Sequence, residues 1–237
     1  MDKEESALAA ENLALFAKLR LPVDHHGGRR VSISQPLART VLSSFQAGFE
    51  RAERKGNAGG LTVIHGGWEH TFFGFEDYNR VQADLVPSSQ KRSTTMLPVH
   101  ELEERSWQPL LFNGIPGFEE LIASAKLQAG AGLTLLACHM LRQDSKQACF
   151  AWHQDNLNNP FVKLSMVFLL SEGSSSMRVA GFEAFNYATQ GDGCAFPSAA
   201  HHRSGPPSPG VLKITFFFGE PQAAAALLVA RQARGEW

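Results

Sequence analysis

Short apolar runs separated by glycine-rich clusters fill the second half of the chain, and this pattern constrains the fold more than any other feature. Residues 132–141 and 163–170 are apolar runs of strand length. Residues 211–218 alternate β-branched and aromatic side chains, which predicts a half-buried strand. Turn clusters divide the strands at 173–176, 191–193 and 205–210. Together these runs predict a small antiparallel barrel or jelly roll.

Helices are predicted on both sides of the β-rich region. Residues 6–20 carry an apolar stripe at helical spacing, which consists of Leu8, Leu13, Leu15, Phe16 and Leu19. Further helices are predicted over 37–54, 118–127 and the alanine-rich 222–234. Residues 61–99 are rich in aromatic residues and glycine and predict strands and loops.

The length of 237 residues fits one domain, because β-barrels of this size commonly form a single core. We expect a mainly β domain with flanking α-helices over 1–237. Its parts would be helical and substrate-side additions at 1–131, the double-stranded β-helix core at 132–220 and a C-terminal helix at 221–237.

Composition argues against several classes of protein. The 22 Lys+Arg residues are balanced by 23 Asp+Glu, so there is no overall basic field to attract nucleic acid. No apolar run is long enough to span a bilayer, and the N-terminus does not resemble a signal peptide. Cys138, Cys149 and Cys194 lack CxxC spacing, which argues against a disulfide framework. We therefore expect the cytoplasm or another soluble intracellular compartment, without membrane association.

The most informative local motif is Trp152-His153-Gln154-Asp155. On an extended strand, residues two apart face the same side, so the His153 imidazole and the Asp155 carboxylate can converge on one ion. Residues 196–203 supply a further imidazole. Two histidines and a carboxylate are the ligands of non-haem iron(II) oxygenases, although zinc hydrolases also use this set.

Lys213 adds a second indication, because it lies within an apolar predicted strand. Its side chain and the hydroxyl of Thr215 should share a face and could bind a carboxylate. A buried lysine needs a counter-ion, since burying an unpaired charge costs several kcal/mol. A dicarboxylic co-substrate would provide that counter-ion.

These residues resemble the iron(II) and 2-oxoglutarate-dependent dioxygenases, and within them the prolyl 4-hydroxylase-like branch. That family carries HxD, then a distal histidine, then Arg or Lys about ten residues later, and here His153, Asp155, His202 and Lys213 match. Phe196-Pro197-Ser198 resembles the FPS that often precedes the distal histidine. The resemblance covers residues 132–220 and implies that they form a double-stranded β-helix, a jelly roll or cupin-like barrel.

The resemblance implies a role for each matched residue. His153, Asp155 and His202 would bind Fe(II), with His201 as the rival third ligand that the FPS register and strand alternation disfavour. Lys213 and Thr215 would hold the far carboxylate of 2-oxoglutarate. Gln143 stands where many members carry a tyrosine, so the tyrosine contact to 2-oxoglutarate is not expected from that position.

The implied activity is hydroxylation of an unactivated C–H bond in a small molecule or a protein or peptide side chain, with succinate and CO2 as co-products and ascorbate as a reductant. Two alternatives remain open at this point. One is a nucleic-acid-oxidising, demethylase-type oxygenase of the same fold, and the other is a non-catalytic metal-binding barrel.

Several polar residues carry weaker expectations. His25 and His26 lie in a polar segment and are expected to be solvated. Arg178 and Arg203 are candidates for binding a substrate anion, with a solvated face as the favoured alternative for Arg178, whereas Arg203 lies beside the predicted ligand. Cys194 is expected either near the iron or packed as a small apolar residue.

Overall fold

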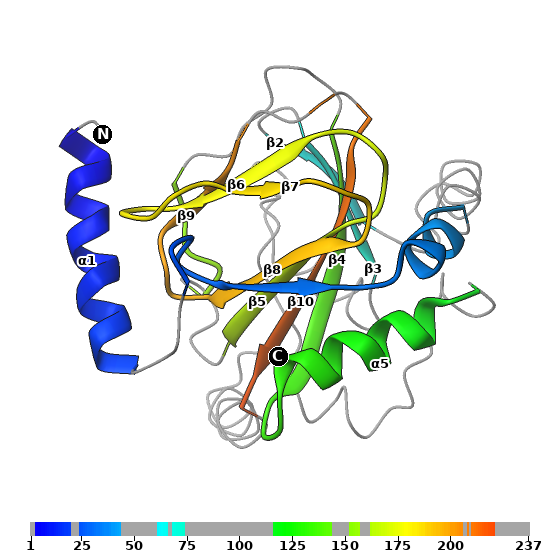
Figure 1. Cartoon of the computed structure of the whole chain (residues 1–237), viewed down its shortest axis with the longest axis horizontal. Helices are drawn as coiled ribbons and strands as arrows, with labels where there is room; N and C mark the ends of the chain where they lie inside the picture. The colour runs from blue at the N-terminus through cyan, green and yellow to red at the C-terminus, as the bar shows by residue number, and fades with distance from the viewer. Residues whose placement is uncertain are drawn as a thin grey trace, which may run out of the picture.

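The computed structural model describes residues 3–19, 24–43, 61–65, 68–73, 116–143, 152–156, 162–205, 208 and 210–220, with 61–65, 68–73 and 136–143 described as backbone alone (Figure 1). The predicted C-terminal helix and most of residues 44–115 lie outside this part of the chain.

The N-terminal helix α1 (Lys3–Leu19) is confirmed, but only part of the expected apolar stripe is covered, because Phe16 is buried and Leu8 and Leu15 are partly buried. Leu13 and Leu19 are 57% and 42% exposed. The buried positions are spaced four, three and four residues apart, as one face of a helix requires, and they are Glu5, Ala9, Asn12 and Phe16. Two of these four residues are polar, so the apolar pattern alone could not identify this face.

Two helices cover the outer face of the larger sheet (Figure 1). Residues 35–43 form the first, and the Ser34 hydroxyl accepts a hydrogen bond from the Leu37 N–H at 3.3 Å, as an N-cap does. The second is α5 (Phe118–Ala129), which matches the prediction over 118–127. Phe118, Leu121 and Ala125 of α5 pack into a core with the sheet. Among the helices of the described ranges, none is long and apolar enough to cross a membrane.

The strands form two antiparallel sheets that lie over each other (Figure 1). The larger sheet has the order β1-β8-β5-β10-β4-β3-β2 and the smaller one β7-β6-β9. Their bounds are β1 Arg29–Ser32, β2 Leu61–His65, β3 Trp68–Phe73, β4 Thr134–Gln143, β5 Val162–Leu169, β6 Ser175–Val179, β7 Phe185–Tyr187, β8 Asp192–Pro197, β9 His202–Ser204 and β10 Leu212–Gly219. The fold is the predicted jelly roll, mainly β with flanking α-helices.

Side chains of the larger sheet alternate between two cores. From β5, Met166 and Phe168 face the helices, whereas Val167 and Leu169 join the core between the sheets. Cys194 of β8 is buried and packs in that second core. This is one of the two alternatives expected for it, packing as a small apolar residue. The turn predictions need correction at two places, because β6 already begins at Ser175 and β8 at Asp192.

Strand β10 positions the predicted co-substrate residues. It pairs with β4 on one side and β5 on the other, and all eight of its residues are buried. The prediction of a half-buried strand is therefore wrong, because helices cover one face of β10 and the smaller sheet covers the other. Ile214 and Phe216 face the helices, so Lys213 and Thr215 face the space between the sheets.

Candidate metal centre

Backbone pairing brings the two candidate ligand histidines together. The His153 N–H donates to the His202 carbonyl at 3.0 Å, and the His202 N–H donates to the His153 carbonyl at 2.9 Å. These two bonds form an isolated antiparallel bridge. The ring centroids lie 4.2 Å apart, so both imidazoles stand on the same side of the bridge. Residues far apart in sequence thus present two nitrogen ligands at one place.

Asp155 completes the cluster. Its Oδ1 lies 3.6 Å from His153 Nε2, and its Oδ2 lies 3.6 Å from His202 Nε2. One ligand atom from each of these three residues lies within 4.8 Å of the other two. Two imidazole nitrogens and a carboxylate oxygen therefore converge on a space that a metal ion could occupy.

His202 is held in the form that binds metals. Its Nδ1 lies 2.9 Å from the Ala200 carbonyl oxygen, which can only accept, so Nδ1 carries the proton and Nε2 keeps its lone pair. Burial lowers the pKa of His202 to about 4; the nearby Asp155 carboxylate opposes this shift, and His153 adds to it. At neutral pH the imidazole is therefore neutral, with Nε2 directed toward Asp155.

Two serines support Asp155 in ways that sequence reasoning missed. The Ser165 hydroxyl donates to Asp155 Oδ2 at 2.5 Å, and its oxygen lies 3.0 Å from the Ser198 hydroxyl. The Asp155 N–H donates to the Ser198 carbonyl at 2.9 Å. The one available signal was that Ser165 interrupts the apolar run of β5. Such contacts orient a ligand and tune its basicity.

The structure separates the two adjacent histidines. His201 Nε2 lies 2.8 Å from Glu11 Oε2 of α1, whereas the ring of His202 faces His153 and packs 4.4 Å from the Phe196 ring. The geometry therefore places the ring of His202, and not that of His201, beside His153 and Asp155.

Lys213 lies in a buried cluster of polar side chains between the sheets. The side chain is 1% exposed, and burial lowers its pKa to about 7. Its Nζ donates to the Ser204 hydroxyl at 3.4 Å and lies 4.9 Å from the centroid of the Tyr187 ring. Thr215, also buried, is two residues along the same strand. This buried polar cluster thus combines the Lys213 amine with neighbouring hydroxyl groups.

Tyr187 was not predicted, and no sequence signal marked it. It is 2% exposed, and burial raises the pKa of its phenol well above the ordinary value. Within the described ranges, its hydroxyl has no hydrogen-bond partner. A buried hydroxyl normally has one, so a missing acceptor is expected here.

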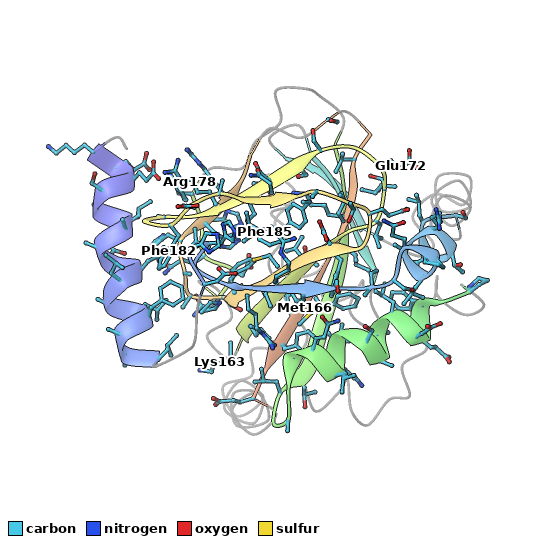
Figure 2. The ribbon with its side chains drawn as sticks, viewed as in Figure 1. Lys163, Met166, Glu172, Arg178, Phe182 and Phe185 are labelled. Atoms are coloured by element: carbon cyan, nitrogen blue, oxygen red, sulfur yellow. The ribbon has the colours of Figure 1, made fainter. Side chains whose placement is uncertain are left out.

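Arg178 and Arg203 each contact another side chain. Arg178 lies beside α1 and forms an ion pair of 2.8 Å with buried Glu5, while its own side chain remains 40% exposed (Figure 2). The Arg203 guanidinium lies 4.3 Å above the Trp152 ring, next to both candidate ligand segments. The side chain of Gln143 lies outside the described part.

Comparison with solved structures identifies proteins of similar fold. No protein-family profile matches the sequence, and a search of characterised proteins finds no match either. Among solved structures, a prolyl hydroxylase in complex with a hypoxia inducible factor oxygen degradation domain peptide fragment from Trichoplax adhaerens is similar with a TM-score of 0.50 and 10% identity, over 95% of this chain and 96% of that chain.

Two further solved structures are similar at slightly lower scores. A prolyl-4-hydroxylase from Pseudomonas putida has a TM-score of 0.45 and 17% identity, over 90% of this chain and 98% of that chain. An oxidoreductase of the 2OG-Fe(II) oxygenase family from Burkholderia pseudomallei has a TM-score of 0.47 and 14% identity, over 89% of each chain. The chain has the double-stranded β-helix fold of the prolyl hydroxylase from the Trichoplax complex.

Proposed function

We propose that this protein is an Fe(II)- and 2-oxoglutarate-dependent dioxygenase that hydroxylates an unactivated C–H bond and releases succinate and CO2. The proposal rests on one observation: a group of potential metal ligands and a buried lysine with hydroxyl neighbours lie between the same two sheets. One is the cluster of His153, Asp155 and His202, and the other is the buried pocket of Lys213 and Tyr187.

The cluster fits iron(II) by its donor chemistry. Two imidazole nitrogens and one carboxylate oxygen form the facial ligand set of non-haem iron oxygenases, which leaves coordination positions open for other ligands. His202 is neutral with its Nε2 lone pair free, and the Ser165 hydroxyl fixes one oxygen of Asp155. We assign the three ligand positions to these residues.

The pocket fits the carboxylate of 2-oxoglutarate. A carboxylate would give the buried Tyr187 hydroxyl the acceptor it lacks among the described residues. It would also place a negative charge beside Lys213, whose charged form burial disfavours. We propose that Lys213, Tyr187 and Thr215 bind this carboxylate. Tyr187 would supply the tyrosine contact to 2-oxoglutarate that is not expected from Gln143.

The chain's own residues would position the reactants. Iron(II) and 2-oxoglutarate, when bound, supply the oxidising power by coupling oxygen reduction to loss of CO2. His153, Asp155 and His202 hold the metal, and the Ala200 carbonyl keeps the proton of His202 on Nδ1. Lys213 and Tyr187 orient the co-substrate, and the Phe196 ring shields His202 from water. Use of ascorbate as a reductant stays a prediction.

The proposed substrate is a small molecule or a peptide or protein side chain. The Trichoplax complex contains a peptide fragment, which makes peptides the first class to test. Arg203 packs against the Trp152 ring, next to both segments that carry the proposed ligands. We propose that it binds an anionic group of the substrate.

The proposal is tested by measuring succinate formed from 2-oxoglutarate with Fe(II) and oxygen, in the presence of amino-acid, peptide and oligonucleotide pools. We expect iron-dependent succinate release, abolished in His153→Ala and His202→Ala. His201→Ala is the matched control and should retain activity. Iron bound without any succinate would favour a non-catalytic barrel, and stimulation by oligonucleotides alone would favour a nucleic-acid oxygenase.

A further inference from the structure

A second group of metal-binding side chains lies outside the proposed iron site. His25, His26 and Glu183 each offer one ligand atom, and these atoms all lie within 4.8 Å of one another. The histidines belong to the turn before β1, and Glu183 belongs to the loop between β6 and β7. His25 and Glu183 are exposed, and His26 is partly buried, so the cluster opens to solvent.

Backbone contacts fix the two segments against each other. The Glu183 N–H donates to the His25 carbonyl at 3.0 Å. Within the turn, the Asp24 carboxylate accepts the His26 N–H at 2.8 Å, and the Gly27 N–H donates to the Asp24 carbonyl at 3.0 Å. Gly27 has φ of +74°, and a Cβ there would lie 2.8 Å from the Phe182 ring. The side chains are therefore brought together by a rigid backbone.

The rings of the two histidines are also restrained. Their centroids lie 3.8 Å apart, and the His26 ring meets the Phe185 ring edge-on at 5.5 Å. His26 was expected to be solvated, but its Nδ1 is buried and lacks a hydrogen-bond partner in the part of the chain that is described. A buried ring nitrogen without a partner is costly, and a bound cation would relieve that cost.

We propose that His25, His26 and Glu183 bind a zinc(II) ion, with water in the remaining position. Two imidazoles and a carboxylate suit zinc, and the open position matches the exposure of the cluster. The ion would join the turn preceding β1, an edge strand of the larger sheet, to the β6–β7 loop of the smaller sheet. Because these segments are far apart in sequence, the ion would stabilise the fold as a cross-link.

The test counts zinc ions bound to the full-length protein by competition with a chromophoric chelator, because the proposed iron site should also take zinc. We expect two bound ions in the wild-type protein. Glu183→Gln should weaken one of them by at least about tenfold, since it removes a charged ligand while the exposed position tolerates the change. His153→Ala should weaken the other one.

Glu172→Gln is the matched control, because Glu172 is also an exposed loop glutamate and lies far from Phe182 and Phe185 (Figure 2). It should leave both ions bound as in the wild type. Thermal unfolding gives a second readout: zinc should raise the Tm of His153→Ala, and the added Glu183→Gln change should remove this shift. A single zinc ion that His153→Ala removes and Glu183→Gln leaves in place, or two unchanged ions in Glu183→Gln, would overturn the proposal.

Discussion

The side-chain amide of Asn12 pairs with the backbone of His201 in both directions. Its Nδ2 donates to the His201 carbonyl at 3.0 Å, and its Oδ1 accepts the His201 N–H at 2.8 Å. The second amide proton goes to the Ala180 carbonyl at 3.0 Å. Through these bonds, α1 holds the residue that immediately precedes the candidate ligand His202.

Replacing Asn12 should therefore destabilise the protein. Asn12→Leu keeps a similar volume but removes the hydrogen bonds of the His201 N–H and the Ala180 carbonyl, whereas the His201 carbonyl keeps the bond from the Ala180 N–H. The free energy of unfolding should therefore fall by about 2 kcal/mol. Chemical denaturation measures this loss. Leu13→Ala on the exposed side of α1 is the control and should change stability by less than about 0.5 kcal/mol. A loss in Asn12→Leu no larger than in the control would contradict the prediction.

The Ser165 hydroxyl should tune metal binding through Asp155. Ser165→Ala removes the 2.5 Å hydrogen bond to the carboxylate, and loss of such a contact lowers metal affinity by roughly 10- to 100-fold. Isothermal titration with a divalent metal measures the change. Ser175→Ala is a matched control, because the buried Ser175 hydroxyl contacts no hydrogen-bond partner among the described residues. Equal affinities in the two variants would show that Ser165 does not act on the ligand.

Tyr187→Phe should separate stability from co-substrate binding. The hydroxyl makes no hydrogen bond within the described chain, so its removal should leave the stability of the unliganded protein unchanged or slightly higher. If it binds the carboxylate of 2-oxoglutarate, its loss should weaken that binding about tenfold, the equivalent of one hydrogen bond. Binding assays with N-oxalylglycine provide the measurement, and unchanged affinity would remove Tyr187 from the pocket.

The pKa of Lys213, near 7, makes co-substrate binding depend on pH. A carboxylate binds the protonated amine, so affinity for 2-oxoglutarate should be highest below pH 7. Above pH 7 it should fall by up to about tenfold per pH unit as the free protein loses this proton. Lys213→Arg stays charged and should show a flat profile over the same range. A flat profile in the wild type would contradict this assignment.

The same residue should affect the stability of the unliganded protein. The pKa of Lys213 is lower in the folded chain than the ordinary value of 10.5, so the unfolded chain binds more protons between about pH 7 and 10.5. This residue therefore makes stability rise with pH across that window, by an amount on the order of a few kcal/mol. Denaturation at several pH values should show this rise, and Lys213→Met should lack it.

Parts of the site could be predicted because they depend on local periodicity. His153 and Asp155 follow from the two-residue repeat of a strand, and Lys213 stands out as a charge within an apolar run. The FPS register favoured His202 over His201. In the structure the His201 ring contacts the Glu11 carboxylate of α1 instead of the candidate metal site.

Other parts depend on contacts between segments that are remote in sequence. Tyr187 enters the pocket because β7 of the smaller sheet lies over β10, and the position of Ser165 beside Asp155 depends on the fold of a different segment. The buried face of α1 was missed because Glu5 and Asn12 are polar, and apolar periodicity cannot mark polar residues that bind specific partners.

The two backbone hydrogen bonds between His153 and His202 determine when the proposed metal site forms. Because the backbone itself joins these remote segments, we expect the chain entropy of bringing them together to be lost during folding rather than on metal binding. Metal uptake then requires little rearrangement of the backbone, so the whole coordination energy contributes to affinity. A protein built this way should exchange one divalent metal for another without unfolding, and its occupancy would follow the metals available around it.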